Sequence, residues 1–279
     1  MRQIVAQIPH GFQTGHAWIN QVQIRELTGY DEQLIASTQN FFPPFKTSLL
    51  LARVIKEFNN QPPTQQLDPL ETIRNLPVGD RIALILHLRK ITFGPILHCT
   101  IQCPNCADNL SIDFPIDSIL QPPQTNPQTT YHLKLEDYSL QIRPITGADL
   151  ENITLNQNTP NLQEKLLRYC ILTSDPPLPE ILNTQLQEQL STKLSEIDQQ
   201  ADLTLNINCH ACNKTFQTPL DIEDFFFQEV TSRCRQLERE IHWIALHYHW
   251  TEKDILALPS SKRKRYVELI NTSLSGESI

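Results

Sequence analysis

Two segments of the chain show the same alternation of apolar and polar residues, and in both the alternation runs into a glycine. They read VQIRELTGYDEQLI at residues 22–35 and LQIRPITGADLENI at residues 140–153, so both contain Q-I-R-x-[LI]-T-G-x-D. The alternation predicts a half-buried strand, the glycine permits a turn, and the threonine or aspartate can cap a following helix. We therefore predict two strand–turn–helix joints with a structural role, formed by Thr28, Gly29 and Asp31 and by Thr146, Gly147 and Asp149.

The elements predicted after the two joints follow in the same order. An apolar helical segment comes first, at residues 49–58 and 162–172, and a Leu-Pro pair then opens a second helical stretch, at Leu76 and at Leu178. Each series ends in an alternating strand that runs into C-x-x-C, and this order indicates an internal duplication. We predict an α+β fold with two duplicated strand–turn–helix halves joined by a zinc-ribbon-like pair of hairpins. The halves span residues 1–120 and 131–220 on either side of a Pro-rich linker, and a C-terminal helical arm spans residues 221–279.

The two C-x-x-C pairs contain four of the 7 cysteines: Cys103, Cys106, Cys209 and Cys212. Two such pairs supply the tetrahedral four-sulfur set that zinc prefers. A zinc ribbon normally separates its pairs by about 15–20 residues, whereas these pairs are much farther apart. Pseudo-twofold packing of the duplicated halves would bring them together. We therefore predict one structural zinc, whose four protein ligands leave no open position for catalysis.

Two other interpretations of the cysteine pairs are a redox dithiol and the loss of the metal from this chain. A thioredoxin-type C-x-x-C begins a helix after a strand, whereas these pairs lie between strands, which disfavours redox chemistry. His98, Cys99 and His210 are substitute ligands of second choice, because the symmetry of the two pairs favours the paired cysteines. Cys170 and Cys234 fall on apolar positions of predicted helices and are expected to pack in the core.

A long helix is predicted from about residue 225 to residue 248. Its apolar positions alternate steps of three and four, a heptad spacing that implies a partner helix in this chain or in another protein. We predict a partner-binding seam on this helix and a cationic partner contact on the helix that follows, formed by Val230, Leu237, Ile241 and Ile244 and by Arg263 and Arg265. The histidines of HWIALHYHW at residues 242–250 do not share one helical face, so we expect an aromatic cluster there rather than a metal site.

Composition and charge narrow the classes of function. Asp and Glu outnumber Lys and Arg by 31 to 23, and the formal net charge of −8 disfavours generic binding to nucleic-acid phosphates. The 7 glycines form neither G-x-G-x-x-G nor G-x-x-x-x-G-K-[ST], the two commonest nucleotide-binding patterns. No apolar run is long enough to span a bilayer, and the first 30 residues lack the pattern of a signal peptide. We expect a cytoplasmic protein that is not an enzyme.

Three features of the sequence carry a resemblance to a known family. They are the strand and T-G-x-D joint in a half that ends in C-x-x-C, the second C-x-x-C followed by PLDIEDFFFQEV, and the tail EIHWIALHYHWTEKDILALPSSKRKRYVELI. In these features the chain resembles baseplate and hub-assembly proteins of T-even-like contractile phage tails and of phage-derived contractile injection systems. The resemblance implies a non-enzymatic baseplate component or assembly factor, cytoplasmic or incorporated into a tail-like particle. Its implied partners are other baseplate, hub or tail proteins, with no small-molecule substrate and no membrane insertion.

The alternative function from another class is a zinc-ribbon regulator that binds nucleic acid through the basic residues 262–265. The acidic net charge and the lack of basic residues around either C-x-x-C count against this alternative.

Overall fold

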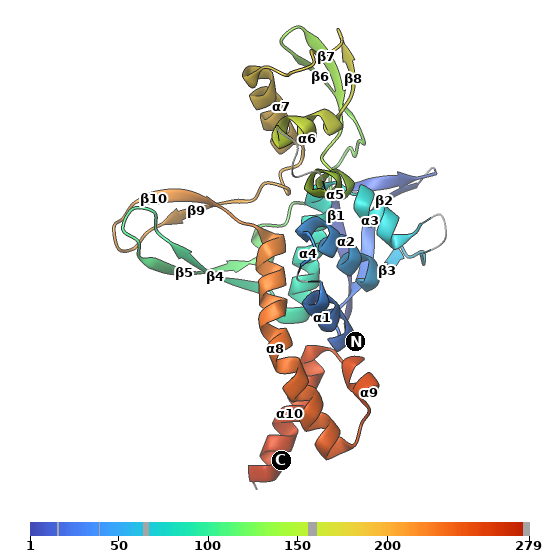
Figure 1. The fold of residues 1–279 in the computed structure, drawn as a ribbon, viewed down its shortest axis with the longest axis vertical. Coiled ribbons are helices and arrows are strands. Elements are labelled where there is room, and N and C mark those ends of the chain that lie inside the picture. Colours follow the sequence, from blue (N-terminus) through green and yellow to red (C-terminus); the bar gives the residue numbers. More distant parts are fainter. Residues whose placement is uncertain (16, 39, 64–66, 156–160, 276–279) are drawn as a thin grey trace.

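The computed structural model describes residues 1–15, 17–38, 40–63, 67–155 and 161–275. Figure 1 shows a central body from which three parts project: a small sheet with helices at the top, two hairpins at one side, and a group of helices at the bottom. Helices and strands are mixed along the chain, so the predicted α+β class is confirmed. The predicted metal ligands lie on the hairpins, and the two predicted joints lie where the body meets the upper and the lower part.

The first half of the chain forms the central body. Its antiparallel strands have the order β1-β2-β3, and helix α4 packs along β1. The middle of α4 is apolar on several faces and is buried accordingly, with Leu84, Ile85 and Leu88 fully enclosed. The elements of the body are β1 (Gln3–Thr14), β2 (Ala17–Arg25), α1 (Gly29–Ser37), α2 (Pro43–Val54), β3 (Ile55–Phe58), α3 (Pro69–Asn75) and α4 (Val78–Phe93).

The upper part repeats the plan of the body in a shorter form. Its antiparallel sheet has the order β6-β7-β8, and the central strand of each sheet leads through a joint into a helix. In both sheets the pairing of the central strand with the third strand is irregular at the same motif position, at Gln23/Ile24 and at Gln141/Ile142. This shared irregularity supports an internal duplication. The elements are β6 (Tyr131–Leu135), β7 (Tyr138–Ile142), α5 (Gly147–Leu155), α6 (Leu162–Cys170), β8 (Ile171–Asp175) and α7 (Thr184–Ile197).

The third strand of each sheet shortens a predicted helix. Residues 49–58 were expected to be helical, but α2 ends at Val54 and β3 begins at once, and in the upper part α6 ends at Cys170 where β8 begins. In β3 the two end residues, Ile55 and Phe58, are buried. The strand pairs with β2. Pairing with an existing strand therefore decides the conformation of residues whose apolar pattern also fits the end of a helix.

Two hairpins extend from the body side by side (Figure 1). Strand β4 (Ile96–Gln102) pairs with β5 (Asn109–Pro115), which is followed by a short 3₁₀ helix, and β9 (Thr204–Asn208) pairs with β10 (Thr215–Pro219). An isolated two-stranded hairpin is marginally stable in water. These two hairpins share a small core that contains Leu110, Leu205 and Ile207, so each depends on the other.

The lower part is built on one long helix. Helix α8 (Ile222–Tyr248) begins at the body and leads to a helical hairpin formed by α9 (Glu252–Leu256) and α10 (Ser260–Ser275). Its first turns contribute Phe226, Phe227 and Val230 to the hydrophobic core of the central body, which we call the main core. Its last turns form a separate small core with α9 and α10, centred on Ile244, Ile255 and Ile270. Helix α8 of the predicted arm is therefore shared between two cores.

The seam that we predicted to bind another protein is covered by this chain. Val230 and Ile244 are 0% exposed and Leu237 is 4% exposed, and Ile241 packs against the small core of α8, α9 and α10. Heptad spacing indicates that a helix face has a partner, but it does not say in which chain the partner lies. The prediction of an intermolecular seam is therefore wrong for these residues.

A buried polar cluster joins the two halves. His10 Nε2 on β1 lies 3.1 Å from Oδ1 of Asp198 at the end of α7, and Asp80 on α4 accepts the backbone N–H groups of His10 and Gly11 at 2.8 and 2.9 Å. Gln124 of the linker lies 3.0 Å from His10 Nδ1. Burial lowers the pKa of His10, but the hydrogen bond to Asp198 and the charges of Asp198 and Asp80 outweigh burial and raise it. Burial raises the pKa of Asp80 to about 7.

Candidate metal centre

Each C-x-x-C pair lies in the loop at the tip of a hairpin, and the first loop is closed by two backbone hydrogen bonds. The N–H of Cys103 donates to the carbonyl of Asp108 at 2.8 Å, and the N–H of Ala107 donates back to the carbonyl of Cys103 at 2.9 Å. Ala107 has a left-handed backbone with a φ of 60°. This conformation is costly for a residue with a Cβ atom, so the contacts of the loop must hold it.

The second loop repeats this geometry. The N–H of Cys209 donates to the carbonyl of Lys214 at 3.0 Å, and the N–H of Asn213 donates to the carbonyl of Cys209 at 2.8 Å. Asn213, like Ala107, follows the second cysteine of its pair, and its φ is 57°. The two tips are therefore equivalent turns on hairpins that come from the two halves of the chain.

The four sulfur atoms of these loops form one cluster, in which all lie within 4.8 Å of one another. Across the two hairpins, Cys103 Sγ lies 3.8 Å from Cys212 Sγ, and Cys106 Sγ lies 3.6 Å from Cys209 Sγ. Tetrahedral zinc–sulfur bonds of about 2.3 Å separate neighbouring sulfurs by about 3.8 Å. The structure thus brings together the four cysteines predicted from the sequence, and they can hold one metal ion.

The surroundings of the sulfurs favour ionised cysteine at two positions. The backbone N–H of Lys214 lowers the pKa of Cys212 to about 7. Burial raises the pKa of Cys103, but the backbone N–H groups of Cys106 and Asn105 outweigh burial and lower it. The thiolate is the form that binds a metal. The loops therefore supply backbone donors that stabilise a metal-binding state of the cysteines.

Ionisation of all four sulfurs requires a compensating positive charge. The N–H of Asp108 lowers the pKa of Cys106, but burial and the hydrogen bonds to Cys209, Cys103 and Cys212 raise it to about 12. Like charges at this separation disfavour one another. A divalent cation at the centre would remove this conflict and allow all four thiolates to form.

Among the residues that the structure describes, these cysteines form the one group of three or more His, Cys, Asp or Glu side chains placed to share a metal ion. Two of the second-choice ligands lie elsewhere: Cys99 is buried in the main core, and His98 Nδ1 lies 2.7 Å from Asp113 Oδ1. The third, His210, follows Cys209 in the second loop but is exposed and does not belong to the group. Cys170 and Cys234 pack against the cores of the upper part and of the body, respectively. The histidine-rich end of α8 forms ring contacts such as Trp243 with His247.

The two joints also share their contacts, and both include an arginine that the sequence analysis did not assign. Arg25 donates to the two carboxylate oxygens of Asp31 at 2.5 and 3.0 Å. Arg143 donates to those of Asp149 at 2.6 and 2.9 Å. The signal was present in the sequence, because both motifs place an arginine six residues before the aspartate. The motif is therefore an arginine–aspartate pair that closes the turn between a strand and a helix.

The threonine of each joint completes the cap. The backbone N–H and the hydroxyl of Thr28 both donate to Asp31 at 2.9 Å, and those of Thr146 donate to Asp149 at 2.9 and 2.8 Å. Burial raises the pKa of each aspartate, but the hydrogen bonds from arginine and threonine outweigh burial and lower it. Both carboxylates are therefore held in the ionised form.

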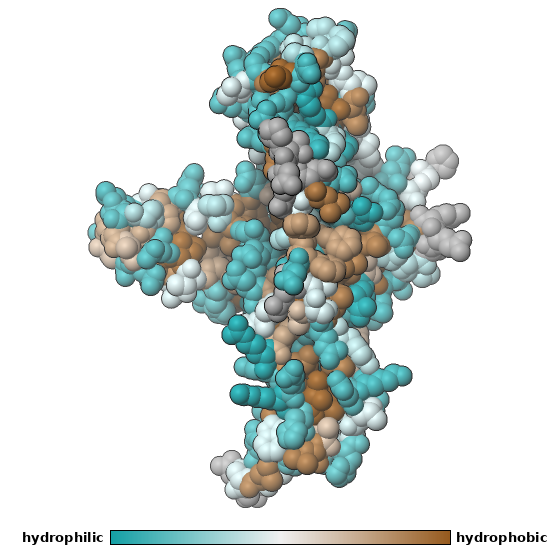
Figure 2. Space-filling model, in the orientation of Figure 1, coloured by the Kyte–Doolittle hydropathy of each residue, from teal (hydrophilic) through white to brown (hydrophobic). Residues whose placement is uncertain are grey.

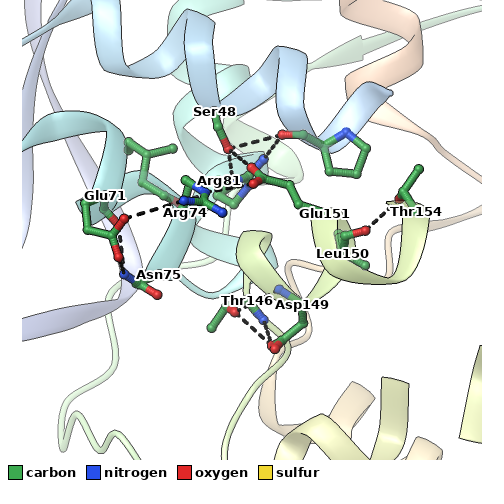
Figure 3. Close-up of polar contacts among 12 residues, drawn as sticks. Ser48, Glu71, Arg74, Asn75, Arg81, Thr146, Asp149, Leu150, Glu151 and Thr154 are labelled. Atoms are coloured by element: carbon green, nitrogen blue, oxygen red, sulfur yellow. Dashed lines mark hydrogen bonds and ion pairs between the residues drawn. The ribbon is translucent and has the colours of Figure 1, made fainter. Parts of the chain in front are cut away.

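The joint of the second half is covered by a Leu-Pro corner of the first half. The N–H of Gly147 donates to the carbonyl of Leu76 at 3.2 Å, and Thr146 forms a β-bridge with Pro77. Four residues after this proline, Arg81 is fully buried and donates to Ser48 Oγ at 2.8 Å. Figure 3 shows Arg81 and Arg74 meeting Ser48 and Glu151 at this contact.

The joint of the first half is covered in the same manner by the C-terminal helices. The N–H of Gly29 donates to the carbonyl of Leu258 at 3.3 Å, and Thr28 forms a β-bridge with Pro259. Four residues after this proline, Arg263 donates to Glu32 Oε2 at 2.6 Å and to Glu240 Oε2 at 2.8 Å.

A family model described as T4 bacteriophage base plate protein matches residues 1–146, just over half of the chain. The chain belongs to this family. No curated protein and no solved structure matches it. The matched segment contains the body, the first hairpin and the linker, and it ends at Thr146 in the second joint. Membership of the base plate family indicates a structural role and contacts with other baseplate or tail proteins.

One predicted contact residue of this chain has a different role. Arg263 was expected to bind a partner, but its side chain is 1% exposed between Glu32 and Glu240. The sequence shows four consecutive cations. Only the fold shows that one of them, Arg263, lies between two carboxylates. Arg265 is exposed, and its contact with a partner stays a prediction. In the described part of this chain, no helix is long and apolar enough to cross a membrane.

Proposed function

We propose that this chain is a non-enzymatic component or assembly factor of the baseplate of a contractile tail-like particle, acting through protein–protein contacts. The observation that carries the proposal is the match of residues 1–146 to the base plate family. The contacts between distant segments are consistent with a scaffold, because the two halves close on each other at the hairpins and at the buried cluster around His10. The chain would act on neighbouring tail proteins without changing them chemically.

The four cysteines would bind one zinc ion that stabilises this scaffold. The sulfur separations of 3.6 and 3.8 Å across the hairpins suit a tetrahedral zinc, and four thiolates are a ligand set that zinc accepts in structural sites. Because every position around the ion would be filled by protein, the zinc would have no role in binding a substrate. It would fasten the hairpin of one half to the hairpin of the other.

An exposed aromatic surface at the start of α2 is suited to bind a neighbouring baseplate or tail protein. Phe41, Phe42 and Phe45 are 45, 41 and 37% exposed, and the rings of Phe41 and Phe45 lie 5.8 Å apart. Figure 2 shows apolar side chains gathered over the middle of the molecule, where α2 lies in Figure 1. Aromatic side chains are enriched at protein–protein interfaces, so we assign this surface to the baseplate contact.

Purified particles test the proposed function directly. Particles isolated from cells that produce the tagged chain should contain it by mass spectrometry if it is a permanent component. An assembly factor should be absent from finished particles, which should fail to form when the chain is deleted. Normal particles that lack the chain and form without it would contradict both versions.

A variant can then separate the contact from the fold. Replacement of Phe41 and Phe45 by serine should reduce particle formation while the purified chain keeps its thermal stability, because both rings lie at the surface. Replacement of the exposed Leu274, on α10, by serine is the matched control and should leave assembly unchanged. If the chain instead binds DNA or RNA and the substitution Arg265→Glu abolishes that binding, the nucleic-acid function replaces this proposal.

A further inference from the structure

The structure contains the same contact twice, between a T-G-x-D joint and a Leu-Pro corner. In both copies the glycine N–H donates to the carbonyl of the leucine, at 3.2 Å for Gly147 and Leu76 and at 3.3 Å for Gly29 and Leu258. In both copies the threonine and the proline form a β-bridge. A buried arginine also lies four residues after the proline in each corner. The contact is therefore a defined mode of docking between two short structural units.

The docking does not depend on the order of the two units in the chain. The corner on the second joint comes from an earlier segment, since Leu76 precedes Gly147. The corner on the first joint comes from a later one, and its Arg263 is 231 residues from Glu32. Because sequence proximity does not hold either corner in place, the specificity must come from the local contacts. Those contacts would be equally available if the corner belonged to another molecule.

The C-terminal corner is attached to the molecule through a limited set of contacts. Helices α9 and α10 share a small core with the last turns of α8, and their contact with the body is centred on the first joint. Beyond Arg263, the contact with α1 includes the hydroxyl of Tyr30, which donates to the carbonyl of Lys253 at 3.3 Å. The unit formed by α9 and α10 could therefore be transferred as one piece.

A short turn connects this unit to α8. Helix α8 ends at Tyr248 and is capped by His249, whose φ of 58° is left-handed, and Thr251 caps α9. His249 is exposed, so its side chain contributes little that a substitution would remove. A left-handed conformation is unfavourable for a residue with a Cβ atom, and short strained hinge loops favour the exchange of an element between copies.

We propose that α9 and α10 form an exchangeable docking element, through which the corner at Leu258–Arg263 of one copy seats on the Thr28–Glu32 joint of a second copy. The turn at His249 would open, and α9 and α10 would pack against α8 and α1 of the second copy with the contacts seen within one chain. Glu32 and Glu240 of that copy would receive Arg263. A closed monomer and an exchanged dimer would then differ mainly at the hinge.

Two complementary variants test this exchange. Gly29→Leu blocks the joint, because even a Cβ atom at this position would lie 3.0 Å from the Cα of Leu256, and it leaves the corner intact. Arg263→Glu disables the corner, because it places a third carboxylate beside Glu32 and Glu240, and it leaves the joint intact. Each variant alone should be monomeric, whereas an equimolar mixture should form a heterodimer by light scattering. A mixture that remains monomeric would overturn the proposal.

Substitutions at the hinge provide a test that leaves the docking contact untouched. His249→Gly relieves the left-handed turn and should favour the monomer, whereas His249→Val strains it and should favour the dimer. The dimerisation constants of the two variants should differ by about a hundredfold, because the exchange opens one hinge in each of the two copies and the left-handed conformation costs about 1–2 kcal/mol per hinge for a residue with a Cβ atom. Equal constants for the two variants, or no dimer of either, would show that the element is not exchanged.

Discussion

Gly147 lies so close to Arg81 that a Cβ atom at position 147 would be 1.8 Å from the Nη1 atom of the arginine. The guanidinium group has little freedom to move away, because Nη1 donates to Ser48 Oγ at 2.8 Å and Nη2 donates to the carbonyl of Pro44 at 2.6 Å. The glycine of the second joint is therefore required by the close approach of a buried side chain. A positive φ is not the reason, since the backbone of Gly147 lies outside the left-handed region.

The substitution Gly147→Ala should destabilise the protein by about 3 kcal/mol, because it either overpacks the contact or displaces a buried, hydrogen-bonded arginine. Urea unfolding measures this change in the free energy of unfolding. Ala148→Ser in the same helical turn is the control and should cost less than about 1 kcal/mol. A Gly147→Ala variant as stable as the control would contradict the described packing.

Arg263 and Arg265 lie in the same basic segment but should respond differently to substitution. Arg263→Ala should lower the free energy of unfolding by about 3–5 kcal/mol, because it leaves Glu32 and Glu240 buried without their cation. Arg265→Ala should change it by less than about 0.5 kcal/mol, because its side chain is exposed. Denaturant unfolding of the two variants measures the difference. Equal stabilities of the two variants would indicate that Arg263, like Arg265, lies at the surface.

Metal analysis should find about one zinc per chain in protein purified without chelator. Cys106→Ser should reduce this value to near zero, because three sulfurs cannot complete the tetrahedral set. Cys234→Ser is the matched control and should keep the metal, since Cys234 lies outside the cluster. Structural zinc contributes on the order of 10 kcal/mol to the folding of small zinc-binding peptides, so chelation should lower the melting temperature of the wild type and not that of Cys106→Ser.

The stability of the wild type should depend on pH through Asp80. Its pKa is about 7 in the folded chain and about 3.9 in an unfolded one. The protonated form therefore favours folding. The stability that protonated Asp80 contributes is fully present below pH of about 4 and is lost as the pH rises toward 7. The free energy of unfolding then falls by at most about 1.4 kcal/mol per pH unit.

Two variants isolate this dependence. Asp80→Asn should remove the Asp80 part of the slope, even if it also lowers stability at every pH. Asp149→Asn should keep the slope between pH 4 and 7, because the pKa of Asp149 is lowered and its stabilising effect is lost only as the pH falls below about 4. Chemical denaturation at a series of pH values measures all three proteins. The same slope in the wild type and Asp80→Asn would rule out the assignment.

The features that could be predicted from the sequence are those with a local physical cause. The joints at Gly29 and Gly147 follow an alternating strand and carry their own capping residues, and the hairpins carry both period-two alternation and C-x-x-C. The pairing of the distant cysteines could also be predicted, because duplicated halves allow a twofold arrangement. The sulfur cluster has the predicted four members.

The features that could not be predicted depend on which segments meet. The apolar face of α8 identifies a buried surface, but Val230 and Ile244 lie in different cores of the same chain. Four successive cations at residues 262–265 look alike in the sequence, and only the position of Glu32, 231 residues from Arg263, distinguishes one of them. The corners could not be predicted, because nothing in a Leu-Pro pair indicates which distant joint it will contact in the fold.

The long separation between Glu32 and Arg263 also has a consequence in time. A ribosome adds about 5–20 residues per second, so the 231 residues that follow Glu32 up to and including Arg263 take roughly 10–50 s to synthesise. Throughout this interval the nascent first half exposes Glu32 and the N–H of Gly29 without their final cover. The second joint can be covered as soon as it is made, since Leu76 and Arg81 are synthesised before Gly147. The first half is therefore made first, but its joint is the last of the two to be completed.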